Sequence, residues 1–132
     1  MTTGERVAAA ALATVGARFR PQGRDPALGL DCVGVVAVAV AAVRPDVRLP
    51  RDYALRAAVL PAGAIPAGAV PCAGEAAGDV LLLRVAATQL HLAIRTEDGI
   101  VHADAGAGRV VARPGVPPWP VVAAWRLGER EG

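Results

Sequence analysis

Three residues of this chain have side chains that together could perform nucleophilic catalysis: Cys32, His91 and His102. A cysteine thiolate is a strong nucleophile, an imidazole can take up and return a proton, and a third polar group can hold that imidazole in place. His91 and His102 are the only histidines in the sequence. The set favours acyl transfer through a covalent intermediate, and two unrelated, half-buried histidines are the competing interpretation.

Composition excludes several other kinds of site. The sequence has no serine, asparagine or lysine, so all 14 basic residues are arginine. This excludes a serine nucleophile, a Ser–Lys dyad, a Cys–His–Asn triad and a phosphate loop that ends in Lys-Ser/Thr. The net charge is only +2 and aromatic residues are few, so we expect no nucleic-acid binding. The cysteines and histidines lack the close pairs of a structural zinc site, and we expect no metal and no other cofactor.

Cys32 lies in the stretch LGLDCVGVV, directly after Asp31. An aspartate in this position can cap a helix by accepting a backbone N–H. Residues 32 to 43 are almost all apolar, which predicts a buried helix, with a buried strand as the alternative. At the start of a helix, the thiol would have its pKa lowered by the helix dipole and by a neighbouring imidazolium. Gly34, one turn further on, leaves room for another segment to approach closely.

The two histidines fall in neighbouring predicted strands on either side of the turn TEDG. A four-residue loop would place Ala93 opposite His102, whereas a two-residue loop would place Arg95 opposite His102. In both registers the side chains of His91 and His102 point to the same face, because side chains alternate along a strand. The sequence therefore predicts that the two rings lie close together.

The remaining elements predict an α+β layout in one domain spanning residues 1–132, with helices first and an antiparallel meander after them. Cys72 lies in an irregular segment rich in proline and glycine; we interpret it as incidental, and a disulfide with Cys32 stays open. The predicted helices span 3–16, 32–43 and 51–60, the irregular segments 17–31 and 61–78, and the strands 79–84, 89–95, 99–104, 109–113 and 121–126.

Four stretches, in this order, resemble the NlpC-type cysteine peptidases, a compact papain-like family of bacterial and phage cell-wall endopeptidases. They are GARFRPQGRDPALGLDCVGVV (16–36), GDVLLLR (78–84), QLHLAI (89–94) and GIVHA (99–103). The resemblance implies a papain-like fold, with N-terminal helices packed on a C-terminal antiparallel sheet of about five strands. It also implies that Cys32 is the nucleophile, His91 the general base and then acid, and His102 the residue that orients His91. The implied substrate is an amide bond of a peptidoglycan stem peptide, cleaved through a thioester and without a cofactor.

The oxyanion and substrate contacts are less defined by the resemblance. Members of the family often carry a tyrosine in the loop before the cysteine, where this chain has Phe19. The role of the missing hydroxyl passes to Gln22, to Arg24 or to no residue, with backbone N–H groups at the helix start as further donors. Asp31 and Tyr53, the one tyrosine of the chain, complete the candidate set.

The stretches GRDP, GLDCVG and PPWPVVAAWRL are most similar to the short, leaderless form of the family, encoded among the tail genes of phages and of gene transfer agents. The N-terminal residues lack a signal-peptide pattern, and no stretch is long enough to insert into a membrane. The resemblance implies bacterial peptidoglycan and tail-tip or baseplate proteins as partners, synthesis in the cytoplasm and action in the periplasm or cell wall. The alternatives are another papain-like amidase or acyltransferase, and a non-catalytic structural tail component.

Overall fold

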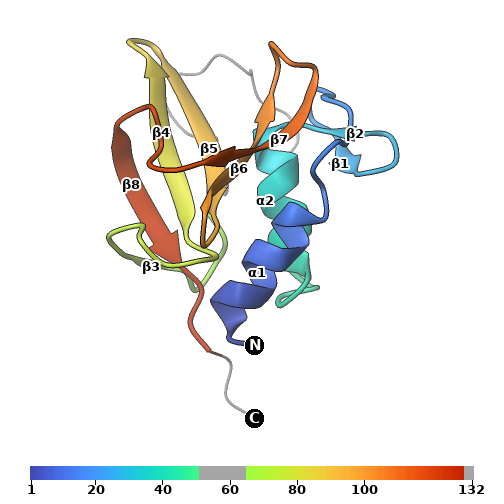
Figure 1. The fold of residues 1–132 in the computed structure, drawn as a ribbon. Helices are drawn as coiled ribbons and strands as arrows, with labels where there is room; N and C mark the ends of the chain where they lie inside the picture. The colour runs from blue at the N-terminus through green and yellow to red at the C-terminus, as the bar shows by residue number, and fades with distance from the viewer. Residues whose placement is uncertain (51–64, 130–132) are drawn as a thin grey trace.

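The computed structural model describes residues 1–50 and 65–129, in which two helices pack against one face of a six-stranded antiparallel sheet (Figure 1). The helices are α1 (Thr3–Leu12) and α2 (Cys32–Ala41). The strands are β1 (Arg24–Asp25), β2 (Gly29–Leu30), β3 (Val70–Pro71), β4 (Val80–Ala86), β5 (Gln89–Arg95), β6 (Gly99–Asp104), β7 (Arg109–Pro114) and β8 (Val121–Arg126). The α+β prediction is therefore confirmed. The helix predicted over 51–60 and Tyr53 lie outside the described residues.

Helix α1 begins at a capping box. The Thr2 hydroxyl accepts the Glu5 backbone N–H, and the Glu5 carboxylate accepts the Thr2 N–H in return. Its buried residues recur at helical spacing and face the core. The helix ends at Leu12, one turn before the predicted end, and the chain turns back at Gly16, whose φ of +93° suits glycine.

Helix α2 is the buried helix that the sequence predicts. Asp31 caps it by accepting the Gly34 N–H, and apolar side chains cover nearly its whole surface. It packs against both α1 and β5, and α1 also contacts β5, so the two helices lie side by side on the sheet. It ends at Ala41, slightly before the predicted end at residue 43.

The five predicted strands all form, but their order differs from a simple meander. The order in the sheet is β3-β8-β4-β5-β6-β7, so β8 returns to pair with β4 instead of following β7. The segment between β7 and β8 crosses the sheet to reach that edge (Figure 1). The meander prediction was wrong. β4 carries buried residues on both faces, so the backbone N–H and C=O groups along both of its edges need hydrogen-bonding strands, and β8 is the second of these strands. The short strands β1 and β2 pair within the segment predicted to be irregular.

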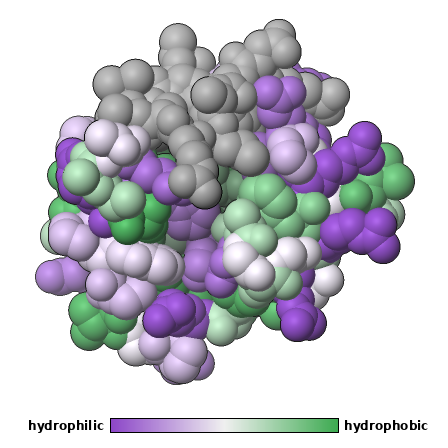
Figure 2. All heavy atoms as spheres, turned by 90° about the horizontal axis from the view of Figure 1, so that it is seen from above, coloured by the Kyte–Doolittle hydropathy of each residue, from purple (hydrophilic) through white to green (hydrophobic). Residues whose placement is uncertain are grey.

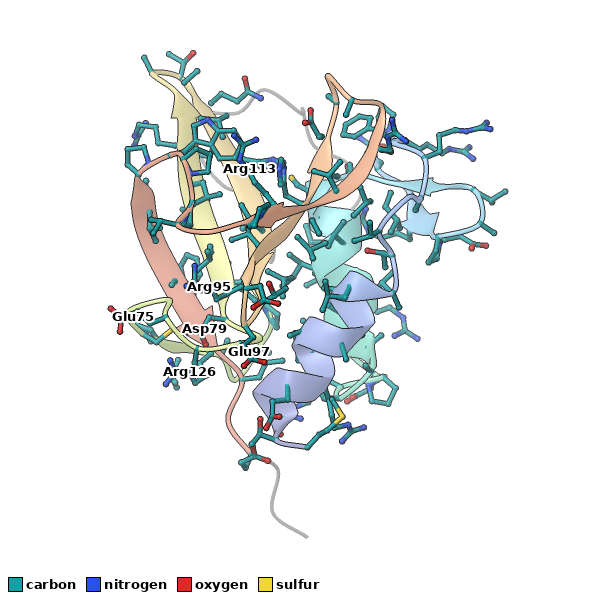
Figure 3. All side chains as sticks on the ribbon, viewed as in Figure 1. Glu75, Asp79, Arg95, Glu97, Arg113 and Arg126 are labelled. Atoms are coloured by element: carbon teal, nitrogen blue, oxygen red, sulfur yellow. The ribbon has the colours of Figure 1, made fainter. Side chains whose placement is uncertain are left out.

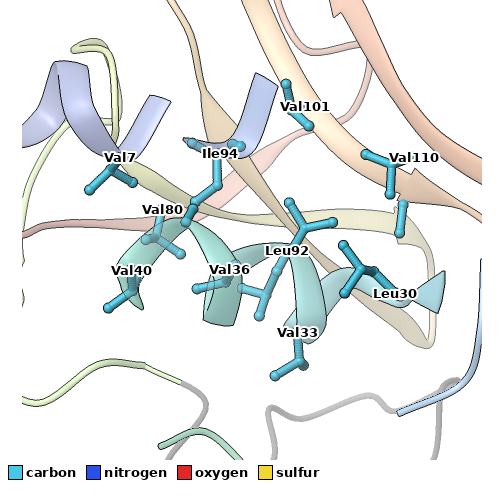
Figure 4. Close-up of a cluster of buried hydrophobic side chains, with 14 of the residues drawn as sticks. Val7, Leu30, Val33, Val36, Val40, Val80, Leu92, Ile94, Val101 and Val110 are labelled. Atoms are coloured by element: carbon cyan, nitrogen blue, oxygen red, sulfur yellow. The ribbon is translucent and has the colours of Figure 1, made fainter. Parts of the chain in front are cut away.

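The core has two parts, one on each face of the sheet. The larger part lies between the sheet and the helices and is built mostly of valine, leucine and isoleucine; Figure 4 labels Val7, Leu30, Val33, Val36, Val40, Val80, Leu92, Ile94, Val101 and Val110. The smaller part contains no helix residue and consists of Leu81, Leu83, Ala93, Ile100 and Ala124, with Cys72, Val85 and Trp119 packed against it. Because side chains alternate along β5 and β6, His91 and His102 lie on the same face as this smaller part.

Residues of the GDV stretch, at the start of β4, make contacts that hold several elements together. The Asp79 carboxylate is fully buried and accepts hydrogen bonds from Arg126 Nε at 2.8 Å and Nη2 at 2.9 Å (Figure 3). It also accepts the Ala76 N–H at 3.0 Å. A Cβ at Gly78 would lie 2.2 Å from the carbonyl oxygen of Gly4, so this position needs glycine to contact α1. None of the helices among the described residues combines the length and hydrophobicity needed to span a bilayer.

Candidate active site

The β5–β6 hairpin brings the two histidines into contact. The register pairs Arg95 with Ile100 and Ile94 with Val101, which is the register of the four-residue loop; the two-residue alternative is wrong. His91 Nε2 lies 3.0 Å from His102 Nδ1, a hydrogen-bond distance. The ring planes are nearly perpendicular, at 87°, with centroids 5.1 Å apart.

A cavity of about 450 Å³ opens beside this pair. Strands β5 and β6 are paired at the two positions next to their turn, and the cavity lies beyond them, toward the other end of the hairpin. Cys32 reaches the cavity from the start of α2, on the helix side of the sheet, and the histidines reach it from the strands. The lining residues are Phe19, Cys32, Val85, Gln89, His91, His102, Ala103, Asp104, Ala105, Gly106 and Trp119.

Cys32 is the first residue of α2, as predicted, but its thiol is not activated in the way predicted. Burial raises the pKa of Cys32 to about 11, and the negative charge of Asp31 contributes to this rise. Hydrogen bonds with the backbone of Leu92 and Val33 act in the opposite direction, without overcoming the effect of burial. The expected lowering of the thiol pKa by the helix dipole and an imidazolium was therefore wrong.

The histidines are correspondingly hard to protonate. Burial, reinforced by the positive charge that His102 can carry, lowers the pKa of His91 to about 4. Burial also lowers the pKa of His102, with a further contribution from the cation of Arg113, while Asp104 raises it. At neutral pH the site therefore holds a neutral thiol and two neutral imidazoles.

Asp31 organises the loop that leads to Cys32. Its carboxylate is fully buried and accepts the Gly34 N–H at 2.9 Å, the Gln22 N–H at 2.6 Å and Arg24 Nη1 at 3.2 Å. A Cβ at Gly34 would lie 2.1 Å from the carbonyl oxygen of Gly23, so glycine there lets this loop pack directly on the helix. The DCVG stretch therefore fixes the position of the thiol.

The other predicted contact residues divide between the cavity and this loop. Phe19 lines the cavity. Gln22, Arg24 and Asp31 are instead joined in the network around the helix cap, and they are not among the residues that line the cavity. Tyr53 lies outside the described residues.

Sequence reasoning missed Trp119, Gln89 and Asp104, which also line the cavity. The signal for Trp119 was present, since a tryptophan between prolines in PPWP, just before a strand, is a rigidly held aromatic ring. Asp104 shapes the turn after β6, where its carboxylate accepts the Gly106 N–H at 2.9 Å and the Ala107 N–H at 3.1 Å. The stretch DAG is typical of such a turn.

The second cysteine lies in a different environment. Cys72 hydrogen-bonds to the Asp79 carboxylate, away from the cavity. Cys32 and Cys72 are both free thiols, which answers the question of a disulfide between them. Among residues 1–50 and 65–129, no group of three or more histidine, cysteine, aspartate or glutamate side chains is arranged to hold a metal ion.

Comparisons with known proteins agree on the fold. No protein-family model and no curated protein matches the sequence. Among solved structures, NlpC2 from Trichomonas vaginalis is similar over 95% of this chain, with a TM-score of 0.67 and 18% identity; the chain spans about half, 48%, of that protein. The NlpC/p60 domain of the peptidoglycan hydrolase SagA is similar over 84% of this chain and 88% of that domain, with a TM-score of 0.59 and 23% identity. The chain thus has an NlpC/p60-like α+β fold.

Proposed function

We propose that this protein is a cysteine peptidase that hydrolyses amide bonds in peptidoglycan stem peptides. The observation that carries the proposal is the 3.0 Å contact between His91 Nε2 and His102 Nδ1 in a cavity that Cys32 also lines. The likeness of the fold to the NlpC/p60 domain of a peptidoglycan hydrolase supports the substrate class.

The contact between the histidines supports a separate role for each ring nitrogen of His91. His91 Nε2 is occupied by His102, so Nδ1 is the nitrogen that His91 can offer to the thiol. When His91 carries its proton on Nε2 and donates it to His102, Nδ1 has a free lone pair and can act as a base. His102 is then a positioning residue that selects this tautomer.

The reaction starts from the neutral thiol and neutral imidazole. As Cys32 Sγ bonds to the carbonyl carbon, its proton passes to His91 Nδ1 and the carbonyl electrons move to oxygen. The C–N bond then breaks, and His91 returns the proton to the leaving amine, which leaves a thioester. Water attacks the thioester while His91 takes one of its protons; the C–S bond breaks, and His91 returns that proton to the thiol.

The oxyanion requires donors close to the sulfur. The backbone N–H of Cys32, at the positive end of α2, is the donor that we propose. The Asp31 carboxylate accepts the Gly34 N–H as a cap, and a carboxylate oxygen acts as an acceptor, so Asp31 does not supply a hydrogen bond to an oxyanion. The absence of a hydroxyl at Phe19 is consistent with a hole built from backbone groups.

The chemical character of the cavity favours a peptide over a lipid acyl chain. Its wall combines the polar side chains Gln89, His91, His102 and Asp104 with apolar ones. Hydrophilic and hydrophobic residues are also interspersed over the described part of the face seen from above (Figure 2). A lipid acyltransferase would need a continuous apolar groove instead.

Digestion of purified peptidoglycan tests the proposal. Under reducing conditions, wild type should release fragments with new amino and carboxyl termini within the stem peptide, and mass spectrometry of the fragments identifies the bond. Cys32→Ala should release none, while circular dichroism shows that it is folded. Identical fragments from both proteins, or none from wild type, would exclude a peptidase that uses Cys32.

For delivery, we propose that a phage-like or gene-transfer-agent tail carries the peptidase to the cell wall. The support is the resemblance of the GRDP, GLDCVG and PPWPVVAAWRL stretches to peptidases encoded among tail genes. Mass spectrometry of purified particles should find the chain together with tail-tip or baseplate proteins. Particles that lack it, from cells that express it, would contradict tail delivery without affecting the peptidase proposal.

A further inference from the structure

Trp119 covers the histidine pair from outside. Its ring centroid lies 5.4 Å from that of His102 and 6.4 Å from that of His91, with interplanar angles of 83° and 82°. Both are edge-to-face arrangements, which aromatic rings prefer over face-to-face stacking. The ring belongs to the segment between β7 and β8 that crosses the sheet, with Pro118 and Pro120 as its neighbours. Its position is therefore held by a stiff backbone.

One ring nitrogen of His102 has no conventional hydrogen-bond partner in the described part of the structure. His102 is 2% exposed, and its Nε2 is buried without a hydrogen bond among the described residues. A buried polar atom in this state normally costs about 1–3 kcal/mol, so it needs an explanation. The Trp119 ring packs against the imidazole of His102 and limits the access of water to it.

Arg113 holds Trp119 from another side. Its guanidinium carbon lies 5.4 Å from the centre of the Trp119 ring, within the range of a cation–π interaction. Arg113 is on β7, at the end of the sheet opposite Asp79 and Arg126 (Figure 3). The tryptophan ring thus contacts a cation and both imidazoles.

We infer that Trp119, held by Arg113, is a positioning residue of the active site: it shields the His102 ring from water on the side away from His91, so that His102 keeps His91 as its partner. The inference deepens the proposed function and rests on it for its catalytic meaning. The sealing itself is a physical property of the folded protein and can be measured without substrate.

Sealing has a defined electrostatic consequence. Within residues 1–50 and 65–129, the charged or titratable groups around the pair are Cys32 from α2, Asp104 from β6 and Arg113 from β7. Burial is the largest cause that lowers the pKa of both histidines, while Asp104 raises both. Water that enters after removal of Trp119 would stabilise the imidazolium forms, so the pKa of His91 should rise from about 4 toward the ordinary value near 6.5.

Proton NMR titration of the full chain measures this directly, because the sequence contains only two histidines. Single substitutions at His91 and His102 assign the two ring Cε1–H signals. In wild type, the His91 signal should titrate near pH 4. Trp119→Ala should raise that midpoint by about one pH unit or more. The pH at which kcat/KM on stem peptide falls to half on the acid side should move upward by a similar amount.

Trp125 provides the matched control, since it is the other tryptophan, packs on the helix-side core and is not among the residues that line the cavity. Trp125→Phe should leave both midpoints unchanged. Trp119→Phe should give an intermediate shift, and Arg113→Gln, at an exposed position, should raise the His102 midpoint.

Two outcomes would overturn the inference. One is a His91 midpoint in folded Trp119→Ala that matches wild type, and the other is an equal shift in Trp125→Phe. If Trp119→Ala does not fold, the Trp119→Phe and Arg113→Gln variants decide, and unchanged midpoints in both exclude a sealing role. A wild type that cuts no peptidoglycan would count against the proposed function while the titration result stands.

Discussion

Two polar pairs bridge strands of this sheet, and each has a cysteine beside it. At one end, the Asp79 carboxylate accepts two hydrogen bonds from Arg126 and a third from the Ala76 N–H, and Cys72 lies next to it. Although burial raises it, the pKa of Asp79 is held below its ordinary value by hydrogen bonds from Arg126 and Ala76. This pair is charged and well satisfied.

At the other end, His91 and His102 share one hydrogen bond, and the pair is neutral at neutral pH. His102 Nε2 has no hydrogen-bond partner in the described structure, and Cys32 lines the same cavity. The polar pair whose hydrogen bonds are satisfied has a structural role, because it holds strands of the sheet together. A neutral pair that borders a cavity keeps the capacity to accept a proton from a ligand or a thiol.

The largest expected effect concerns catalysis at the histidine end. His91→Gln removes the base that we propose accepts the Cys32 proton, so kcat/KM on stem peptide should fall by about 10³-fold. Wild-type kcat/KM should be lost as pH falls through about 4, where His91 becomes protonated. Steady-state assays from pH 3 to 9 measure both. A variant within about threefold of wild type would remove His91 from the mechanism.

The next effect concerns stability against pH. Because the pKa of His91 is lower in the folded protein, at about 4, than the ordinary 6.5, the unfolded chain binds protons first as pH falls. The free energy of unfolding should therefore drop by about 3 kcal/mol between pH 6.5 and pH 4. In urea titrations, the free energy of unfolding of His91→Gln should drop less over this pH range than that of wild type. The drop that remains is due to protonation of His102. An equal drop in both proteins would contradict a depressed pKa at His91.

A substitution in the Asp79–Arg126 pair should change the stability of the protein and leave its catalytic activity unchanged. Asp79→Asn removes the charge from a carboxylate that accepts three hydrogen bonds, and should lower the free energy of unfolding by about 2 kcal/mol. Its kcat/KM, measured well below the melting temperature, should equal that of wild type. A loss of catalysis as large as that of His91→Gln would erase the distinction between the two ends.

The smallest expected effect concerns His102, the residue proposed to orient His91. His102→Ala removes one hydrogen bond to His91 and should lower kcat about fivefold, at about 1 kcal/mol for the bond. His102→Asn keeps an acceptor near the position of Nδ1 and should retain most of the activity. If Ala and Asn at this position have the same kcat, His102 does not orient His91 through this bond.

The local parts of the fold and site were predictable from the sequence. Asp31 before a long apolar run predicts the capped helix α2, because a cap acts over a few residues. The period of two along β5 and β6 places His91 and His102 on one face, and the hairpin keeps them close.

The non-local parts were not predictable. The return of β8 to β4, which carries Trp119 across the sheet, depends on contacts between segments that are distant in the chain. The same holds for the thiol pKa. The position of Cys32 at a helix start predicts a lowered pKa, but burial by the surrounding segments raises it.

We propose that Cys32, and not Cys72, is the nucleophile of a peptidoglycan peptidase. The most direct test compares Cys32→Ala with Cys72→Ala on purified peptidoglycan under reducing conditions, with fragment release measured by liquid chromatography and mass spectrometry. Cys72→Ala should release the wild-type fragments at the wild-type rate, and folded Cys32→Ala should release none. Release by Cys32→Ala, or its loss in folded Cys72→Ala alone, would contradict the claim.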